Sequence, residues 1–345
     1  MKILFLTHRF HPEIGGIEVN SEILARGFAL AGHDVRVMTW SPGVMDESFT
    51  FPVVRRPGLK ELIRQHVWAD LVYENNPCIR LAWPAVLLGK PTVVALRTWL
   101  SRRDGRIGMQ DRLKVLRLAR ARAVIAISEA VRRRCWSDAV VIGNPYRDHL
   151  FRILPDVARD RDFAFVGRLV SDKGVDLAIE ALDLFLKTGG ESLPGEKSTL
   201  TIIGEGPERK GLERLVGERA LGKHVHFIGK LRGEELVRTL NRHRFLLVPS
   251  RWEEPFGNVA LEGMACGCVP IVSDGGGLPD AVGNSGLIHA RGDDAALADA
   301  MRTAVQNPIL IRAMQEAAPR HLRCHRRDVV VRRYLDVLEA VVPTS

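Results

Sequence analysis

The sequence of 345 residues has few cysteines, and their placement argues against both a disulfide-stabilised protein and a cysteine-based zinc site. The odd number of cysteines, five at scattered positions, does not form a disulfide framework. Cys266 and Cys268 lie inside an apolar run, with no His or Cys partner at zinc spacing. We therefore expect buried thiols at these two positions.

Long apolar runs are also missing. No uncharged stretch approaches the roughly 18 to 20 apolar residues of a membrane-spanning helix. The apolar run at the N-terminus is too short for the core of a signal peptide. With 46% hydrophobic and 26% charged residues, the composition excludes a disordered or fibrous chain. We expect a cytoplasmic protein whose contact with the inner face of the cell membrane is peripheral.

The charge is unevenly distributed along the chain. Lys and Arg number 50 against 41 Asp and Glu, a net charge of +9. Residues 1–160 hold the whole excess, whereas residues 161–345 carry 25 residues of each sign. Within the first part, residues 97–134 carry twelve basic and three acidic side chains. Charge added only for solubility would not be concentrated in one segment.

The first half of the chain alternates strands and helices. Lys2–Thr7 and Asp34–Thr39 read as strands, and residues 18–31 between them have the apolar spacing of a helix that ends at Gly32. Further short apolar runs follow at Ala69–Tyr73, Thr92–Leu96 and Ala123–Ile127. This alternation predicts a parallel sheet with helices on both faces.

The pattern restarts after Asn144-Pro145. Apolar runs at Phe163–Val166, Thr199–Ile203, Val225–Ile228, Phe245–Val248 and Val269–Val272 read as strands, with helical segments between them, such as Val175 to about Lys187. The length also favours two domains. We therefore expect an α/β protein with two Rossmann-like doubly wound domains that face each other across a cleft. Ligands of such sheets bind at the carboxyl ends of the strands.

Glycine-rich turns follow several predicted strands. Gly15-Gly16 precedes a helix whose free N–H groups favour an anion, although a plain tight turn explains the pair as well. Arg168 and Lys173 flank a turn that starts at Gly167, where Arg can grip a phosphate bidentately and Lys supplies a point charge. The alternative is a pair of solvated basic side chains.

Two nucleotide fingerprints are absent from these turns. The Gly167 turn does not have the P-loop spacing, and the turn with Gly204 and Gly206 is not the dinucleotide-binding GxGxxG. A P-loop enzyme and a nicotinamide-dependent enzyme are therefore not supported.

Pro249–Asp280 is the most informative segment. Glu254 lies in the loop before a helix that starts near Asn258, and Glu262 lies about one turn into that helix. Two carboxylates so placed can accept hydrogen bonds from the hydroxyls of a sugar or a ribose. The alternative assigns Glu254 to the helix dipole and Glu262 to the surface, but an unpaired Glu262 among apolar neighbours would be costly.

Taken together and in this order, these segments resemble the retaining GT-B glycosyltransferases of family 4, the glycosyl transferases group 1. The resemblance covers nearly the whole chain and includes HPEIGGIE, AISEAV, GRLVSDKG, GEGPER, the Glu254–Glu262 segment and GGGLPD. It implies transfer of a sugar from a nucleotide diphosphate donor to a hydroxyl acceptor, with retention at the anomeric carbon. The expected role is the biosynthesis of a cell-surface polysaccharide or glycolipid, with a glycan or lipid-linked acceptor.

The resemblance also implies roles for individual residues. Arg168 and Lys173 would hold the diphosphate, Glu254 the donor sugar and Glu262 the ribose. The other residues expected to line the donor site are Gly15, Gly16, Gly167, Gly204, Gly206, Gly257, Asn258, Gly276 and Gly277. The resemblance also implies no metal site, which fits the absence of a DxD-like acidic cluster near a strand end. No cofactor is expected, because the nucleotide-sugar is itself the substrate.

The domains implied are an acceptor-binding domain at 1–150, a donor-binding domain at 151–325 and a final helix at 326–345 that crosses back to the first domain. One departure from the family pattern concerns its usual donor-site His, which is here replaced by Arg97. Arg97 could contact the sugar, but it cannot act as a base. A nucleotide-sugar epimerase, a hydrolase or a non-catalytic sugar-nucleotide binder therefore stays open as an alternative.

The basic segment 97–134 lies in the expected acceptor domain. No nucleic-acid-binding module accompanies it, so we do not expect a nucleic-acid partner. Its helical part mixes Leu113, Leu116 and Leu118 with basic residues and shows no clear amphipathic face, which argues against deep insertion into a bilayer. We expect attraction to an anionic membrane surface or to a phosphate-bearing acceptor, with a merely solvated basic face as the alternative.

Overall fold

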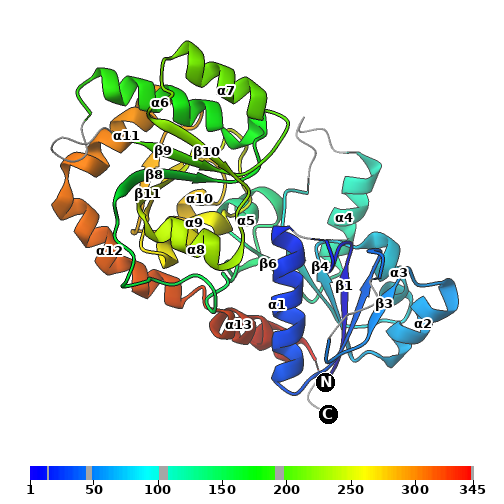
Figure 1. Cartoon of the computed structure of the whole chain (residues 1–345). Coiled ribbons are helices and arrows are strands. Elements are labelled where there is room, and N and C mark those ends of the chain that lie inside the picture. Colours follow the sequence, from blue (N-terminus) through cyan, green and yellow to red (C-terminus); the bar gives the residue numbers. More distant parts are fainter. Residues whose placement is uncertain (14, 44–48, 101–107, 191–197, 343–345) are drawn as a thin grey trace. The chain divides into compact units, whose positions relative to one another are not determined.

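The computed structural model describes residues 1–13, 15–43, 49–100, 108–190 and 198–342. The chain divides into two compact units (Figure 1). Unit 1 comprises Met1–Pro145 and Arg327–Ser345, and unit 2 comprises Tyr146–Arg326. By sequence, unit 1 carries the entire net charge of +9 and unit 2 is neutral. The roles expected for the two domains, acceptor binding and donor binding, stay predictions.

Unit 1 is built on a parallel sheet of seven strands in the order β3-β2-β1-β4-β5-β6-β7. The strands are β1 (Lys2–Thr7), β2 (Asp34–Thr39), β3 (Val53–Arg55), β4 (Leu71–Asn75), β5 (Thr92–Leu96), β6 (Ala123–Ala126) and β7 (Val140–Val141). The central strands are buried on both faces, as continuous apolar runs require in a parallel sheet.

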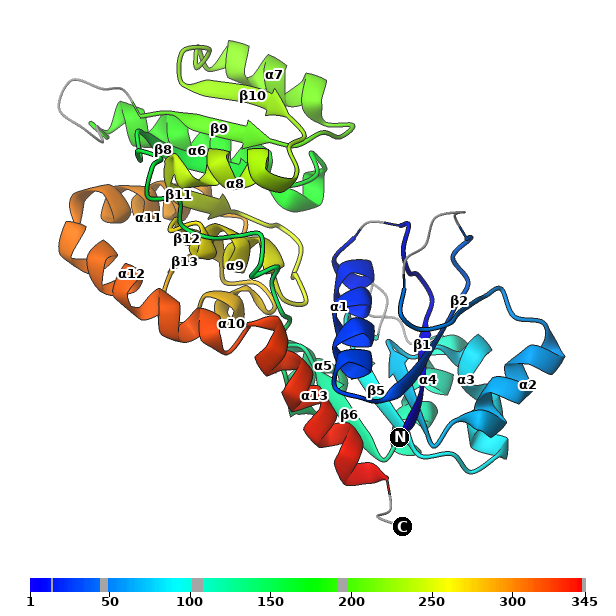
Figure 2. The same cartoon turned by 60° about the horizontal axis from the view of Figure 1, so that its bottom comes forward.

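Helices cover both faces of this sheet. They are α1 (Gly16–Leu30), α2 (Leu59–Trp68), α3 (Ile79–Leu87), α4 (Met109–Ala119), α5 (Glu129–Cys135) and α13 (Arg327–Val341). One core cluster joins α1 and α13 to the sheet, and a second joins α2 and α3 to the other face. Figure 2 shows α1 and α13 on one side of the strands and α2, α3 and α4 on the other. The last helix of the chain therefore belongs to the core of unit 1.

Unit 2 has a parallel sheet of six strands in the order β10-β9-β8-β11-β12-β13. The strands are β8 (Arg161–Val166), β9 (Leu200–Ile203), β10 (Val225–Gly229), β11 (His243–Val248), β12 (Val269–Ser273) and β13 (Leu287–His289). Its main core is aromatic at the centre, where Phe163 of β8 contacts Phe245 of β11 and Phe185.

The helices of unit 2 follow its strands in the same alternation. They are the 3₁₀ turn η1 (Ser171–Lys173), α6 (Val175–Lys187), α7 (Arg209–Glu218), α8 (Gly233–Asn241), α9 (Asn258–Ala265), α10 (Leu278–Val282), α11 (Asp294–Gln306) and α12 (Pro308–Arg323). Helices α6, α7 and α11 pack on the face that holds Phe163 and Phe245. Helix α9 lies on the other face, where Gly263 sits over Leu246.

The structure confirms two parallel α/β sheets, and several strand bounds agree to the residue, such as Lys2–Thr7 and Thr92–Leu96. Three short strands, β3, β7 and β13, were not expected. Each lies at or next to a sheet edge and is at most half buried along most of its length, so it lacks the apolar run that identified the others. The thiols of Cys266 and Cys268 are buried, as expected.

Helix α4 is the described helical part of the basic segment, and it exposes several apolar side chains. Its polar residues Asp111 and Arg117 are buried, whereas Met109, Leu113 and Leu116 form an exposed apolar stripe at spacings of four and three residues. The exposed side of α4 therefore carries apolar side chains together with the exposed Arg112 and Arg120, which agrees with the mixed pattern in the sequence. Arg102, Arg103 and Arg106 lie outside the described residues. None of the described helices has both the length and the apolar character needed to cross a bilayer.

Candidate functional site

The sheet of unit 2 has a topological switch point between β8 and β11. The chain runs from β8 outward to β9 and β10 on one side, and then returns to β11, β12 and β13 on the other side. In open parallel sheets such a point leaves a crevice beyond the carboxyl ends of the two strands, where ligands bind. Arg168 and Lys173 follow β8, and Glu254 follows β11, so the predicted residues flank this point.

Lys173 and Glu254 form an ion pair across the switch point. The Lys173 Nζ lies 2.8 Å from the Glu254 Oε1, and the Ser250 hydroxyl donates a second hydrogen bond to the same oxygen. Glu254 is only 8% exposed, so its carboxylate needs these donors. The arrangement fixes a cation and an anion at adjacent points of the carboxyl edge, although the two residues are 81 positions apart in the chain.

Arg168 is placed differently from Lys173. Its side chain is exposed, and among the residues described by the structure it has no ion-pair partner. It follows Gly167, whose amide donates to the Ile203 carbonyl at the end of β9. The guanidinium is therefore available to a ligand, whereas the Lys173 ammonium is already paired.

The turn after β9 approaches the turn after β8 very closely. A Cβ on Gly204 would lie 1.8 Å from the Gly167 carbonyl oxygen, and Gly204 has a φ of +154°. A side chain at this position would therefore force the two turns apart. Gly206 lies in the same turn, against the Leu169 backbone. The structure thus brings Gly167, Gly204 and Gly206 together at the carboxyl edge.

Glu262 lies one turn into α9, as expected, and it has a partner. The Arg147 Nη2 lies 2.8 Å and its Nε 3.1 Å from the Glu262 Oε1. The Glu262 side chain is 16% exposed, among buried neighbours such as Ala260 and Met264. Burial raises the pKa of Glu262, and the Arg147 guanidinium opposes this rise. The carboxylate is held in one orientation with its second oxygen still able to accept a hydrogen bond.

The segment after β12 closes onto the Glu254 loop. The Gly277 amide donates to the Glu254 carbonyl at 2.7 Å, and Glu254 and Gly276 form a bridge between the two loops. At Gly276 the φ is +66°, and a Cβ would lie 2.2 Å from the Glu254 carbonyl oxygen. Gly257 and Asn258 lie at the start of α9, between this contact and Glu262. All predicted residues of unit 2 therefore belong to loops and helix starts at one edge of its sheet.

The two predicted glycines of unit 1, Gly15 and Gly16, are not packed against neighbouring backbone as Gly204 and Gly276 are. Gly15 is the N-cap of α1 in an extended conformation, and Gly16 begins the helix. A Cβ on Gly16 would meet no atom within 4 Å, and one on Gly15 would meet only the flexible end of Glu18. Packing within unit 1 does not require glycine at Gly16.

Arg97 follows β5 and is buried, with 3% exposure. Its guanidinium donates to the Asn75 Oδ1 at 2.6 Å, the Asn144 Oδ1 at 2.9 Å and the Tyr73 hydroxyl at 3.1 Å. It also lies over the ring of Tyr334 in α13. Among the described acidic residues none forms an ion pair with it, so the cation has neutral partners. The sugar contact expected for Arg97 stays a prediction.

Two residues at the carboxyl edge of unit 2 were missed from the sequence. Arg147 is separated from Glu262 by 115 residues, and no local pattern distinguishes it from the other arginines of the chain. Ser250 lies four residues before Glu254 and could have been noticed as a nearby donor. Neither contact follows from spacing alone.

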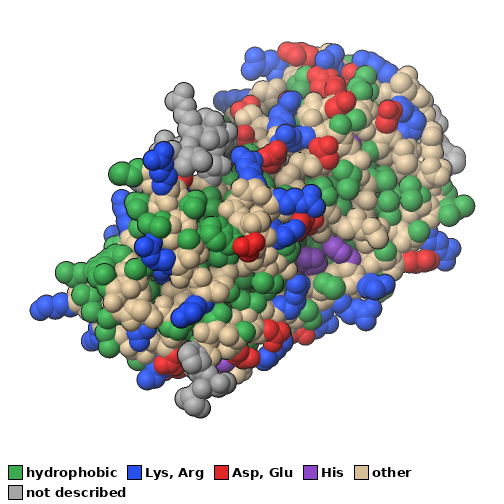
Figure 3. All heavy atoms as spheres, turned by 180° about the vertical axis from the view of Figure 1, so that it is seen from behind, with side chains coloured by type: hydrophobic (Ala, Val, Ile, Leu, Met, Phe, Trp, Pro, Cys, Tyr) green, Lys and Arg blue, Asp and Glu red, His purple; other side chains and the backbone are tan. Residues whose placement is uncertain are grey.

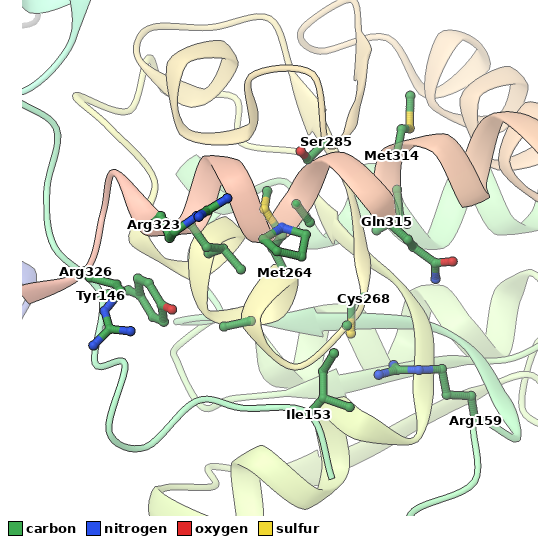
Figure 4. A pocket seen from close by; sticks show the side chains of 16 residues that line it. Tyr146, Ile153, Arg159, Met264, Cys268, Ser285, Met314, Gln315, Arg323 and Arg326 are labelled. Atoms are coloured by element: carbon green, nitrogen blue, oxygen red, sulfur yellow. The ribbon is translucent and has the colours of Figure 1, made fainter. Parts of the chain in front are cut away.

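A cavity of about 520 Å³ in unit 2 lies away from these residues, beside α9, α12 and the start of β12 (Figure 4). Met264, Met314 and Cys268 contribute to its lining, and Figure 4 shows the Arg159 guanidinium pointing toward Cys268. Cys268 precedes β12, so the cavity opens at the amino end of that strand. None of the predicted site residues lines this cavity. In the part of the chain described, no cluster of three His, Cys, Asp or Glu residues is arranged to hold a metal ion.

Comparison with known sequences matches the chain to one family. A profile described as glycosyl transferases group 1 matches residues 147–321. A glycogen synthase of Mycobacterium tuberculosis is 37% identical over 163 residues, which are 47% of this chain and 38% of that protein. A D-inositol 3-phosphate glycosyltransferase of Acidothermus cellulolyticus is 28% identical over 306 residues, covering 79% of this chain and 65% of that protein. The match thus spans about two fifths of the first relative's length.

Comparison with solved structures covers nearly the whole chain. Anabaena HepE in complex with UDP has a TM-score of 0.84 at 21% identity, over 99% of this chain and 100% of that one. Sucrose-phosphate synthase from Thermosynechococcus elongatus has a TM-score of 0.75 at 22% identity, over 98% of each chain. These likenesses show the fold, which is the GT-B fold expected from the sequence.

Proposed function

The chain belongs to the glycosyl transferases group 1 family, and on this premise we propose that it is a retaining glycosyltransferase of family 4. It moves a sugar from a nucleotide diphosphate donor to a hydroxyl acceptor. The observation that carries the proposal is the Lys173–Glu254 pair, at 2.8 Å, on the two sides of the switch point of unit 2. It supplies a cation for a diphosphate next to a carboxylate for sugar hydroxyls.

The reaction uses these groups to stabilise the leaving diphosphate. The bond between the anomeric carbon and the phosphate oxygen breaks, and negative charge develops on the diphosphate. In this proposal Lys173 and Arg168, which follow β8, stabilise this charge, which is electrostatic stabilisation of the transition state. The acceptor oxygen bonds to the same face of the anomeric carbon, and its proton passes to the departing phosphate oxygen. The proposal requires no protein nucleophile and no metal ion.

The donor is held at two further points. Glu254 accepts hydrogen bonds from the sugar, and Glu262, oriented by Arg147, accepts them from the ribose. Gly204 and Gly276 let neighbouring turns pack backbone against backbone, which brings the loops after β8, β9, β11 and β12 together at the edge where the donor would bind. Crystal structures of HepE carry UDP and UDP-glucose, which supports a nucleotide-sugar as the donor.

The proposed setting is the biosynthesis of a cell-surface polysaccharide or glycolipid on the cytoplasmic side of the membrane. The positive charge of unit 1 supports this setting, because a lipid-linked or phosphate-bearing acceptor would be attracted to it. In this proposal unit 1 selects the acceptor and the chain associates with the membrane peripherally.

The test is a thermal-shift screen against UDP-, GDP- and ADP-sugars, followed by transfer assays with the stabilising donor, since a ligand that binds the folded state raises the melting temperature. We expect one donor class to stabilise the protein. The product formed with glycan or glycolipid acceptors should keep the anomeric configuration of the donor, as read by NMR.

Two variants provide the matched comparison. Lys173→Ala should abolish most transfer, whereas Lys210→Ala, an exposed lysine of α7, should not. Full activity of Lys173→Ala would contradict the site assignment. Release of free sugar or of an epimer at a rate independent of any acceptor would instead favour the hydrolase or epimerase alternative.

A further inference from the structure

The outer surface of α2, α3 and α4 exposes an unusual amount of apolar side chain. Helix α2 presents Leu59, Ile63 and Val67, one residue in every four. Large single apolar residues on a protein surface are common, but a contiguous group marks an interaction site. The three helices are neighbours on one face of the sheet of unit 1 (Figure 2).

The other two helices continue the apolar surface. Helix α3 and its C-cap expose Trp83, Val86, Leu87 and Leu88, with Leu87 at 77% and Trp83 at 38% exposure. Helix α4 exposes Met109 at 78%, together with Leu113, Val115 and Leu116. Eleven of the twenty large exposed hydrophobic residues described in the chain lie on these helices, so the apolar surface is concentrated here. We call this surface the α2–α4 face.

Basic side chains are interspersed among these apolar ones. The segments 59–68, 79–90 and 109–122 contain nine Lys or Arg and two acidic residues. Without the buried Arg117 and Asp111, eight basic and one acidic side chain remain, a net charge of +7. Of the two acids, Asp111 is buried at the start of α4, where it accepts a hydrogen bond from the Gly108 amide, and Glu61 pairs with Arg64. In Figure 3 the surface around α2 and α3 shows green and blue side chains with little red.

We propose that the α2–α4 face docks on an anionic lipid surface, with its leucines, valines and Trp83 entering the headgroup region. Charge complementarity selects this partner, because basic side chains would contact the lipid phosphates while the apolar stripes leave water. An aromatic residue such as Trp83 suits the boundary between the two. The inference deepens the peripheral association proposed above and rests on it, but it does not depend on sugar transfer.

The two other occupants fit less well. A symmetric dimer through this face would place a surface of charge +7 against an identical one. A nucleic acid would use the positive charge, but Leu59, Leu87 and Leu113 offer no stacking to bases. The α2–α4 face differs from the membrane contact expected from the sequence, which is the segment 97–134. It includes α4 but not the region of Arg132–Arg134.

The test is sedimentation of the full-length protein with vesicles, measured without donor so that its outcome is independent of the transferase assay. Wild type should bind vesicles of phosphatidylcholine with 30% phosphatidylglycerol and should bind pure phosphatidylcholine much less. The double variant Leu113→Ser/Leu116→Ser should bind the anionic vesicles at least about tenfold more weakly, since it removes apolar area from the contact. Arg112→Ser/Arg120→Ser should show a similar loss at low salt and a smaller one at high salt.

Leu30→Ser is the matched control, because Leu30 is 86% exposed but lies on α1, on the opposite face of the same sheet. It should bind as wild type does. Tryptophan fluorescence should shift to the blue with anionic vesicles, and Trp83→Phe should remove this shift. All these side chains are exposed, so thermal unfolding should confirm intact folding.

Three results would overturn the proposal. They are absence of binding to anionic vesicles, equal binding by the Leu113→Ser/Leu116→Ser variant, and a wild-type dimer that this variant dissociates without any effect of lipid.

Discussion

The carboxyl edges of the two sheets differ in their chemistry. In unit 2 the edge carries full charges of both signs, Lys173 with Glu254 and Arg147 with Glu262, and turns so close that glycine is required. In unit 1 the edge is organised around Arg97, whose partners are neutral amides and hydroxyls, and Gly16 faces open space. The edge of unit 2 therefore holds paired charges on closely packed turns, whereas the edge of unit 1 is organised by hydrogen bonds from one buried cation to neutral groups.

The largest effect should come from the charge of the unit 2 edge. Lys173→Ala should lower the rate of sugar transfer by about 100- to 1000-fold, the range seen when one preorganised donor to a developing negative charge is removed. Lys173→Arg should retain part of the activity because it keeps the charge. Single-turnover kinetics with saturating donor would measure the loss of rate. If steady-state kinetics instead showed a change in KM alone, Lys173 would bind substrate without stabilising the transition state.

The next largest effect should be on stability, when the glycines at the two edges are replaced by alanine. Gly276→Ala places a Cβ 2.2 Å from the Glu254 carbonyl oxygen at a φ of +66°, and strain with overpacking should cost about 2 to 4 kcal/mol of stability. Gly16→Ala, with no atom within 4 Å, should leave stability unchanged. Urea unfolding of both variants would measure the difference. Similar stability for the two would remove this distinction between the edges.

Substitution of Arg97 tests whether its buried hydrogen bonds stabilise unit 1. Arg97→Lys keeps the charge, but a single ammonium cannot reproduce the fork that reaches Tyr73, Asn75 and Asn144. The unpaired buried oxygens should cost about 1 to 3 kcal/mol of the free energy of unfolding. The exposed Arg80→Lys serves as the control. If unfolding is unaffected while donor affinity falls, Arg97 contacts the sugar rather than stabilising unit 1.

The smallest effect is a pH dependence at Glu262. Burial raises the pKa of this carboxyl, so the proton is taken up at a pH above the usual range of a glutamate. As the pH falls through that raised value, nucleotide affinity should drop a few-fold, because a protonated Glu262 is a weaker acceptor. The stability effect has the opposite sign, since the folded state binds this proton more readily than the unfolded chain, so its contribution to stability decreases as the pH rises.

Glu262→Gln, which cannot titrate, should flatten the pH profile of nucleotide binding measured by calorimetry. A profile that keeps its shape in this variant would assign the titration to another group.

The sequence predicted the buried framework well and the edges of the sheets less well. Runs such as Thr92–Leu96 are apolar because both faces of a parallel strand are covered, so their bounds follow from composition. The short strand Val140–Val141 is half exposed, and its pairing with β6 depends on the rest of the sheet. Helix α4 is hard to orient from its sequence for a related reason: an inward Arg117, paired with the buried Glu74, leaves Leu113 and Leu116 outside, whereas Leu118 is buried.

For the site residues, local placement could be predicted from the sequence, but long-range partners could not. Glu254 and Glu262 could be placed in a loop and a helix from local sequence, and the structure places them so. Their partners could not be deduced, because Lys173 lies 81 residues from Glu254 and Arg147 lies 115 residues from Glu262. Such contacts depend on the fold of the whole unit, and the Lys173–Glu254 pair arises because β8 and β11 are neighbours in the sheet.

The most direct test of the assignment of donor binding to unit 2 is hydrogen–deuterium exchange with and without a saturating nucleoside diphosphate. We predict that protection concentrates in peptides that cover 167–174, 204–206 and 254–277, with none at α2 or α3. Protection confined to unit 1, or unchanged exchange at 254–277 while calorimetry reports binding, would contradict the account.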